Sequence, residues 1–196
     1  MAGGVAGTVL RATLQATRRA SGAQYPQLLE QAGLSRYLHT LPPLNEAPAC
    51  TAVEFSRLPA GVYAMLGEPL TRLFLRNIGA LAVPRTLQDP GIQALQANLA
   101  ALPPEARLAP LVRSIGQIVT RTWAPTTLTE DASAWYLSVG ECPTCLSLPP
   151  VSAPICANSE AFYAGFASRL MARRMRVVEV VCRATGGPTC TFAFYK

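Results

Sequence analysis

The chain contains one histidine, His39, and one lysine among its 196 residues, and charged residues make up only 14% of it. A lone imidazole just ahead of Leu41, Pro42 and Pro43 is more often a surface or capping residue than a base or a metal ligand. The sequence also lacks a glycine-rich phosphate loop, a Ser-His-acid arrangement and a dinucleotide fingerprint. We therefore predict no catalytic residues and favour a binding role over an enzymatic one.

Long apolar runs and dense positive charge are missing as well. No segment approaches the roughly 18 consecutive apolar residues of a membrane span. Arg11, Arg18 and Arg19 interrupt the N-terminal segment, so we expect no secretory signal and predict a cytoplasmic protein. This basic start could be read as a transit peptide, but an amphipathic helix with Leu10 and Leu14 facing inward is favoured. The net charge of +6 comes without a basic-aromatic motif, so nucleic acid is not an expected partner.

What the chain does have is apolar residues, which make up 50% of it and are enough for one substantial core. The hydrophobic period changes near Trp123, from helical upstream to strand-like downstream. We predict an α+β fold in which N-terminal helices pack on an antiparallel sheet of about four strands. We expect a helical extension over residues 1–50 and a ligand-binding domain over residues 51–196. The predicted helices span 51–66, 69–82, 91–102 and 105–121, and the predicted strands span 126–129, 134–139, 177–182 and 189–195.

Cysteines gather in the C-terminal part of the chain. Cys156, Glu179, Cys182 and Cys190 offer three thiolates and one carboxylate, which is the ligand set of a closed zinc site with no position left for substrate. Glu179 and Cys182 are three residues apart on a predicted strand, and such side chains point to opposite faces unless a bulge or the strand's end intervenes. Plain buried thiols are the alternative.

The order of motifs in this region resembles that of the 4-vinyl reductase domain family. The shared pattern is a cysteine, a helix with Phe162, Gly165 and Phe166, then Glu-x-x-Cys, a gap holding Gly-Gly-Pro, and Cys-Thr-Phe-x-Phe. The match is strongest over residues 135–196. It implies a structural zinc on Cys156, Glu179, Cys182 and Cys190, as in effector domains of aromatic-sensing transcription activators. It also implies the fold of small vesicle-tethering subunits, which are often dimeric and hold an apolar cavity.

From this resemblance we expect a hydrophobic or aromatic ligand in a pocket between the helices and the sheet. The expected lining residues are Ile115, Val119, Trp135, Phe162 and Phe166, although ordinary core packing would explain the apolar face of helix 105–121 equally well. One alternative function is a tetrapyrrole 4-vinyl reductase, or an accessory protein that presents a chlorophyll precursor. Another is an assembly protein like the vesicle-tethering subunits, with a lipid-filled cavity. A homodimer is expected in either setting.

A second cysteine feature is the pair Cys142 and Cys145, in a C-x-x-C spacing. It could be a dithiol or disulfide without catalytic duty, a redox pair, or a zinc knuckle. A knuckle sharing its metal with Cys182 and Cys190 would leave Cys156 and Glu179 out of the site. The sequence does not decide between these uses.

Two details concern the helix expected after Cys156. Asn158 is placed to cap its N-terminus. Gly165 would allow the helix to approach the sheet closely, because a residue without a side chain leaves room for a neighbouring backbone.

Overall fold

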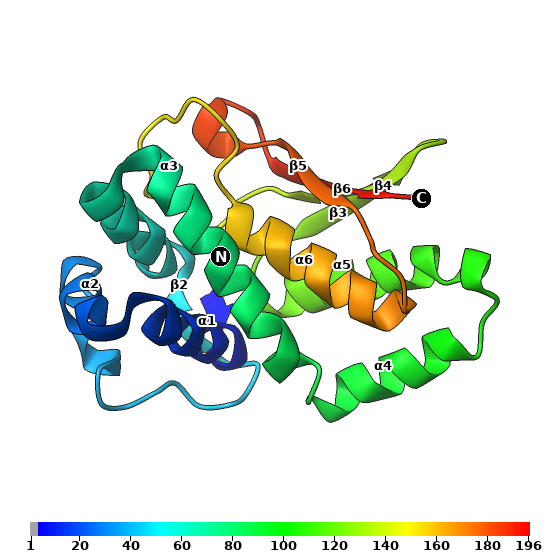
Figure 1. The fold of residues 1–196 in the computed structure, drawn as a ribbon, viewed down its shortest axis with the longest axis horizontal. Coiled ribbons are helices and arrows are strands. Elements are labelled where there is room, and N and C mark those ends of the chain that lie inside the picture. Colours follow the sequence, from blue (N-terminus) through cyan, green and yellow to red (C-terminus); the bar gives the residue numbers. More distant parts are fainter. Residues whose placement is uncertain (1–3) are drawn as a thin grey trace.

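The computed structural model describes residues 4–196 and consists of helices packed on one face of a four-stranded antiparallel sheet, with a separate two-stranded ribbon near the N-terminus (Figure 1). The helices are α1 (Gly7–Ser21), α2 (Tyr25–Gln31), α3 (Ala52–Thr86), α4 (Pro90–Ala100), α5 (Leu108–Thr122) and α6 (Ala157–Met171). The strands are β1 (Gly4–Ala6), β2 (Pro48–Thr51), β3 (Thr126–Glu130), β4 (Ala134–Val139), β5 (Val177–Val181) and β6 (Cys190–Tyr195).

The elements form three layers. Helices α1 and α2 contact α3, α3 contacts α6, and α5 and α6 contact the sheet. Figure 1 shows α6 between α3 and the strands. The approach of α3 to α6 requires Gly79, since a Cβ atom there would overlap the carbonyl oxygen of Asn158.

Helix α3 bends at Gly67, whose φ of 70° and ψ of 175° interrupt the helical backbone. Its two halves contribute to two different hydrophobic clusters. The first half completes the N-terminal cluster, whose members are Val5, Leu10, Leu14, Tyr25, Leu28, Leu29, Ala32, Leu34, Tyr37, Cys50, Phe55, Leu58 and Val62. The second half completes the C-terminal cluster, which includes Leu75, Ile78, Leu111, Ile115, Val119, Leu137, Tyr163, Phe166, Phe192, Phe194 and five cysteines.

The strand order in the main sheet is β3-β4-β6-β5, so β6 lies in the interior beside β4 and β5. Val139 is opposite Cys190, Leu137 is opposite Phe192, and Glu179 is opposite Phe192 on the other side. Paired residues of antiparallel strands share a face. Cys190 and Glu179 therefore lie on the face that α5 and α6 cover.

This architecture confirms the predicted α+β fold and the four-stranded antiparallel sheet. Two local predictions are wrong. Asn158 does not cap α6: Cys156 holds the N-cap position, and the Asn158 amide donates instead to Thr144 Oγ1 at 3.3 Å. Gly165 faces the Val83 side chain of α3 rather than the sheet.

Leu10 and Leu14 are fully buried, as the amphipathic pattern of the first helix predicts. The predicted division at residue 50 stays a prediction, and strand β1 pairs across it with Cys50 and Thr51 of β2. Within residues 4–196, no helix combines the length and the apolar character needed to cross a membrane.

Candidate metal centre

Six potential metal ligands meet where β6 begins, β5 ends and α6 starts. Each side chain is buried, and the donor atoms form two overlapping groups in which all atoms lie within 4.8 Å of one another. We name them after the segments that distinguish them. The hairpin tetrad is Cys156, Glu179, Cys182 and Cys190, and the loop tetrad is Cys142, Cys145, Cys156 and Cys190.

The hairpin tetrad depends on a bulge in β5. Glu179 pairs with Phe192, but Val181 pairs with Thr191, so Val180 is an extra residue in the ladder. The next residue, Cys182, consequently falls on the same face as Glu179 instead of the opposite one. This bulge removes the geometric objection that a regular strand would raise.

Helix α6 brings Cys156 to the same place. Its backbone N–H donates to Glu179 Oε2 at 2.8 Å, and its Sγ lies 3.6 Å from that of Cys190. The other carboxylate oxygen, Oε1, is buried without a hydrogen-bond partner in the part of the chain described. A buried carboxylate oxygen without a partner is costly. Desolvation, with a contribution from Cys182, raises the pKa of the Glu179 carboxyl to about 9.

The loop tetrad forms because Val139, the last residue of β4, pairs with Cys190. The chain leaving β4 turns at once, and this turn carries Cys142 and Cys145 over the start of β6. Cys142 Sγ lies 3.6 Å from Cys156 Sγ, and Cys145 Sγ lies 3.3 Å from Cys190 Sγ. The expectation of a knuckle shared with Cys182 and without Cys156 is therefore wrong, because Cys156 belongs to both tetrads.

The sulfur spacing suits a tetrahedral ion. Two thiolates on one zinc, each at about 2.3 Å, lie about 3.8 Å apart. The closest sulfur pairs here lie 3.3–3.6 Å apart, so a small adjustment would admit an ion. Hydrogen bonds from neighbouring thiols, Cys145 first, lower the pKa of Cys142, whereas the same group of sulfurs, Cys142 first, raises that of Cys156. The buried cysteine cluster could hold a metal ion.

All six of these residues lie in a segment that also matches a known protein family. Residues 135–196, which we call the family segment, match the model of the 4-vinyl reductase domain. This match confirms the resemblance to that family over the residues predicted for it. No curated protein sequence matches the chain.

Solved structures resemble the chain outside the family segment as well. The phenol-responsive sensory domain of the transcription activator PoxR, solved with phenol, has a TM-score of 0.55 and 14% identity, covering 89% of this chain and 90% of that domain. A doubly substituted variant of Tt H-NOX has a TM-score of 0.56 and 14% identity, covering 97% of this chain and 94% of that one. A singly substituted variant of Tt H-NOX has a TM-score of 0.54 at the same 14% identity, covering 98% and 95%. The chain therefore shares the fold of these sensory and H-NOX domains.

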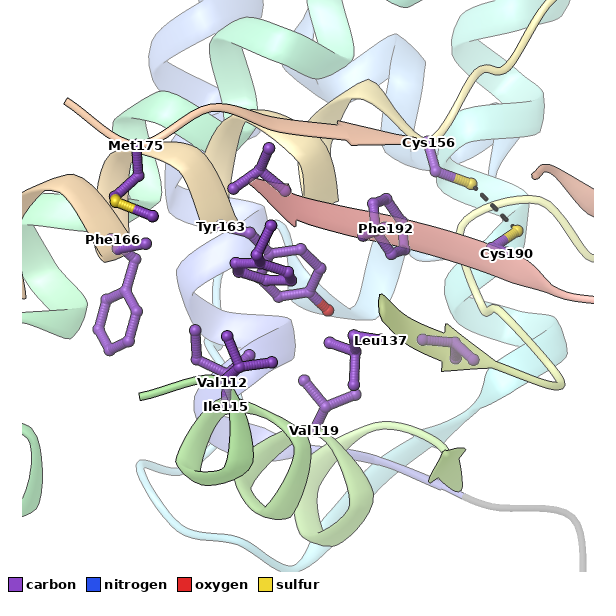
Figure 2. Packing of buried hydrophobic residues seen from close by; sticks show 14 of the residues in the cluster. Val112, Ile115, Val119, Leu137, Cys156, Tyr163, Phe166, Met175, Cys190 and Phe192 are labelled. Atoms are coloured by element: carbon purple, nitrogen blue, oxygen red, sulfur yellow. Dashed lines mark hydrogen bonds between the residues drawn. The ribbon is translucent and has the colours of Figure 1, made fainter. Parts of the chain in front are cut away.

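The five residues predicted to line a ligand pocket all lie in or against the C-terminal cluster, within and beside the family segment. Ile115, Val119, Trp135 and Phe166 are buried members, and Phe162 is a partly buried neighbour. Figure 2 shows Ile115 and Val119 of α5 on the opposite side of the cluster from Phe166. Their shared location is what a pocket between helices and sheet requires, but side chains of the same cluster fill the space between them.

The sequence reasoning missed Tyr163, which lies among these residues. Its ring packs edge-on against Phe192, with centroids 5.1 Å apart, and burial raises the pKa of its hydroxyl. Figure 2 shows this hydroxyl directed toward the region of Leu137 and Val119. Its position next to Phe162 could have drawn attention, because on an amphipathic helix adjacent aromatic residues cannot both face solvent without cost.

Proposed function

We propose that this protein is a small-molecule-binding module that holds a hydrophobic or aromatic ligand between α5, α6 and the sheet, with a structural zinc ion in the hairpin tetrad. The observation that carries the proposal is the shared fold with the phenol-responsive sensory domain of PoxR, over 89% of this chain. The family segment contains every proposed zinc ligand.

The hairpin tetrad fits zinc by its chemistry. It supplies three thiolates and one carboxylate, and Glu179 Oε1 is the buried oxygen that otherwise lacks a partner in the described chain. A bound zinc ion would tie the start of α6 to the β5–β6 hairpin and leave no open coordination position. Thiolates stay available for metal in a reducing compartment, which supports the cytoplasmic location.

The proposed ligand site combines an apolar lining with few polar groups, as is usual for small-molecule sites. Ile115 and Val119 provide aliphatic surface, and the stacked rings of Phe162 and Phe166, 5.5 Å apart, provide aromatic surface. The Tyr163 hydroxyl is the polar group that would orient a phenolic ligand. Ligand entry requires these side chains to rearrange.

The two tryptophans allow the site to be tested by fluorescence. Trp135 belongs to the proposed lining, whereas Trp123 packs against Phe55 of the N-terminal cluster at 5.8 Å between ring centroids. The Trp123→Phe variant reports on Trp135 alone, and Trp135→Phe reports on Trp123 alone. We expect phenol to change the Trp135 emission saturably and to leave the Trp123 emission unchanged. Equal changes in both variants, or none, would contradict the proposed site.

A second candidate is the binding of a porphyrin, favoured by the shared fold with a structure whose subject is heme redox potential and porphyrin distortion, at a TM-score of 0.57 and 13% identity over 98% of this chain. Coordination of heme iron by histidine would have to use His39, which is exposed on a turn. Titration of the same two variants with protoporphyrin separates the candidates. Saturable quenching by porphyrin without a response to phenol would favour the tetrapyrrole function, and co-purified lipid in native mass spectrometry would favour an assembly protein.

A homodimer through the exposed side of α3 also belongs to the proposal. Leu70 and Leu73 are 55% and 57% exposed, and Leu81, on the same helix, is 37% exposed. Contiguous exposed apolar residues often mark protein interfaces. Light scattering after size exclusion should give twice the chain mass for the wild type and the monomer mass for Leu73→Glu. The same substitution at Leu44, which is also exposed but lies outside α3, serves as the control.

A further inference from the structure

The proposed function needs one metal ion, yet the structure brings together ligands for more than one. The loop tetrad has a full set of four thiols of its own, all buried. Neither the family match nor the shared fold assigns a role to Cys142 and Cys145. They lie within the cluster and not beside it, because each has its sulfur 3.6 Å or less from a sulfur of the hairpin tetrad.

We propose that the two tetrads together form a binuclear metal-thiolate centre, in which the sulfurs of Cys156 and Cys190 bridge two divalent ions. The first ion takes Glu179 and Cys182 as its terminal ligands, and the second takes Cys142 and Cys145. Each ion then has four ligands in a tetrahedral shell, as zinc prefers.

The shared sulfurs are placed for bridging. Cys156 Sγ and Cys190 Sγ lie 3.6 Å apart, and each belongs to both groups of mutually close donor atoms. Cys142 approaches one of them and Cys145 the other, so the second ion would be enclosed from two sides. The cysteine ligands of a four-iron cluster bind different irons and must stand further apart, so this spacing favours single tetrahedral ions.

Charge favours the second ion once the first is bound. With one divalent ion in the hairpin tetrad, three thiolates and one carboxylate leave a net charge of −2. The second ion forms bonds to Cys142 and Cys145 as their two S–H bonds break, and two protons leave to solvent. The gain of two positive charges and the loss of two protons keep the buried net charge at −2. No oxidant or reductant takes part.

The loop tetrad also has a route to solvent. A surface hollow of about 380 Å³ is bordered by Cys145, Leu148, Val151 and Arg183. The Arg183 side chain donates to the carbonyl of Gly140 and closes the hollow toward the β4 end. An entry path of this kind is required for an ion that binds after folding.

Protein produced with added zinc and kept reduced should carry two zinc ions per chain by native mass spectrometry and elemental analysis. After exchange with ¹¹³Cd, the NMR spectrum of the wild type should show two resonances that split each other, because coupling passes through a bridging sulfur. The Cys142→Ser/Cys145→Ser variant should retain one ion, and the Glu179→Gln/Cys182→Ser variant should also retain one. The wild-type spectrum decides the question even if either variant fails to fold.

Other results overturn the inference in distinguishable ways. One ion in the wild type that survives Cys142→Ser/Cys145→Ser leaves the hairpin tetrad proposal standing and removes the second site. Two resonances without mutual splitting remove the bridge. One ion that is lost in Cys142→Ser/Cys145→Ser but kept in Glu179→Gln/Cys182→Ser moves the single site to the loop tetrad, and an absence of metal removes both proposals.

Discussion

The N-terminal and C-terminal clusters of this chain are stabilised by different means. The N-terminal cluster consists of apolar side chains from α1, α2 and the first half of α3, with Cys50 as its one thiol among the described residues. The C-terminal cluster includes five buried cysteines, and Glu179 is buried beside them. Apolar packing needs no partner from solution, whereas buried thiols and a buried carboxyl in contact favour a cation. The first cluster should therefore be insensitive to metal and the second should depend on it.

The largest effect is expected from Cys190→Ser, because this residue belongs to both tetrads. The variant should bind no metal and lose more than about 4 kcal/mol in its free energy of unfolding, since loss of a metal is among the few causes of so large a change. Chemical denaturation and elemental analysis measure the two effects. Cys50→Ser is the matched control: it changes a buried thiol of the N-terminal cluster, and should cost about 1 kcal/mol with metal content unchanged.

Hydrogen exchange locates the same effect. In Cys190→Ser, or in the wild type after chelation, amides of β5, β6 and the start of α6 should exchange faster, while those of α1 and α2 keep their protection. Equal loss of protection in both regions would show that the two clusters unfold as one unit.

Phe55→Ala tests the other side of the comparison. Phe55 is 1% exposed and packs against Trp123 in the N-terminal cluster. Its truncation should cost about 3–5 kcal/mol through lost burial and an unfilled cavity. Metal content should remain that of the wild type, and a parallel loss of metal would contradict the separation of the two clusters.

The same contrast explains what the sequence could predict. The α+β fold and the four strands follow from hydrophobic periods, which are local signals, and so does the burial of Leu10 and Leu14. The four residues of the hairpin tetrad could be grouped because a family pattern spans them. That they bind zinc stays a prediction.

Long-range contacts decided the rest. Nothing near Cys142 in sequence indicates that Val139 pairs with Cys190, and this register places the C-x-x-C turn beside Cys156. The bulge at Val180 is equally invisible to a period-two pattern, although the donor set required either it or the strand's end. Gly165 faces α3 because the packing of two helices, which no local pattern specifies, decides its neighbour.

Glu179→Gln sharpens the comparison within the C-terminal cluster. In protein stripped of metal, the folded-state pKa of about 9 lies above the ordinary value of 4.5, so the carboxyl is held neutral by burial. Its contribution to stability is present below pH 4.5 and is lost as the pH rises toward 9. The glutamine side chain of the variant does not titrate, so the metal-free variant should lack this loss.

Metal should reverse the order of the two proteins. Bound metal requires the ionised carboxylate, so the wild type should bind zinc about 10- to 100-fold more tightly than Glu179→Gln, increasingly so at higher pH. Competition with a chromogenic chelator measures the affinities, and thermal melts of stripped protein measure the pH profile. A stripped wild type whose stability rises between about pH 5 and 8 relative to the variant would contradict the assignment.

The smallest effect is expected at Asp131, in the β3–β4 turn, which is part of the C-terminal half but distant in sequence from the metal ligands. Its carboxylate accepts from the Tyr136 hydroxyl at 2.7 Å and from the backbone of Ser133 and Ala134, and these hydrogen bonds, Tyr136 first, hold its pKa below the ordinary 3.8. The stability that this carboxylate contributes is present above pH 3.8 and is lost as the pH falls through the lower folded-state pKa.

Asp131→Asn should therefore lower the melting temperature slightly at neutral pH and flatten this acid-side decline, with zinc content unchanged. Glu130→Gln, which removes only an ion pair with Lys196, is the control on the same hairpin. Because the turn lies at the opposite end of β4 from the cysteines, a change in zinc content at Asp131→Asn would mean that metal binding depends on the whole sheet and not on the bulge and the two loops at one end of it.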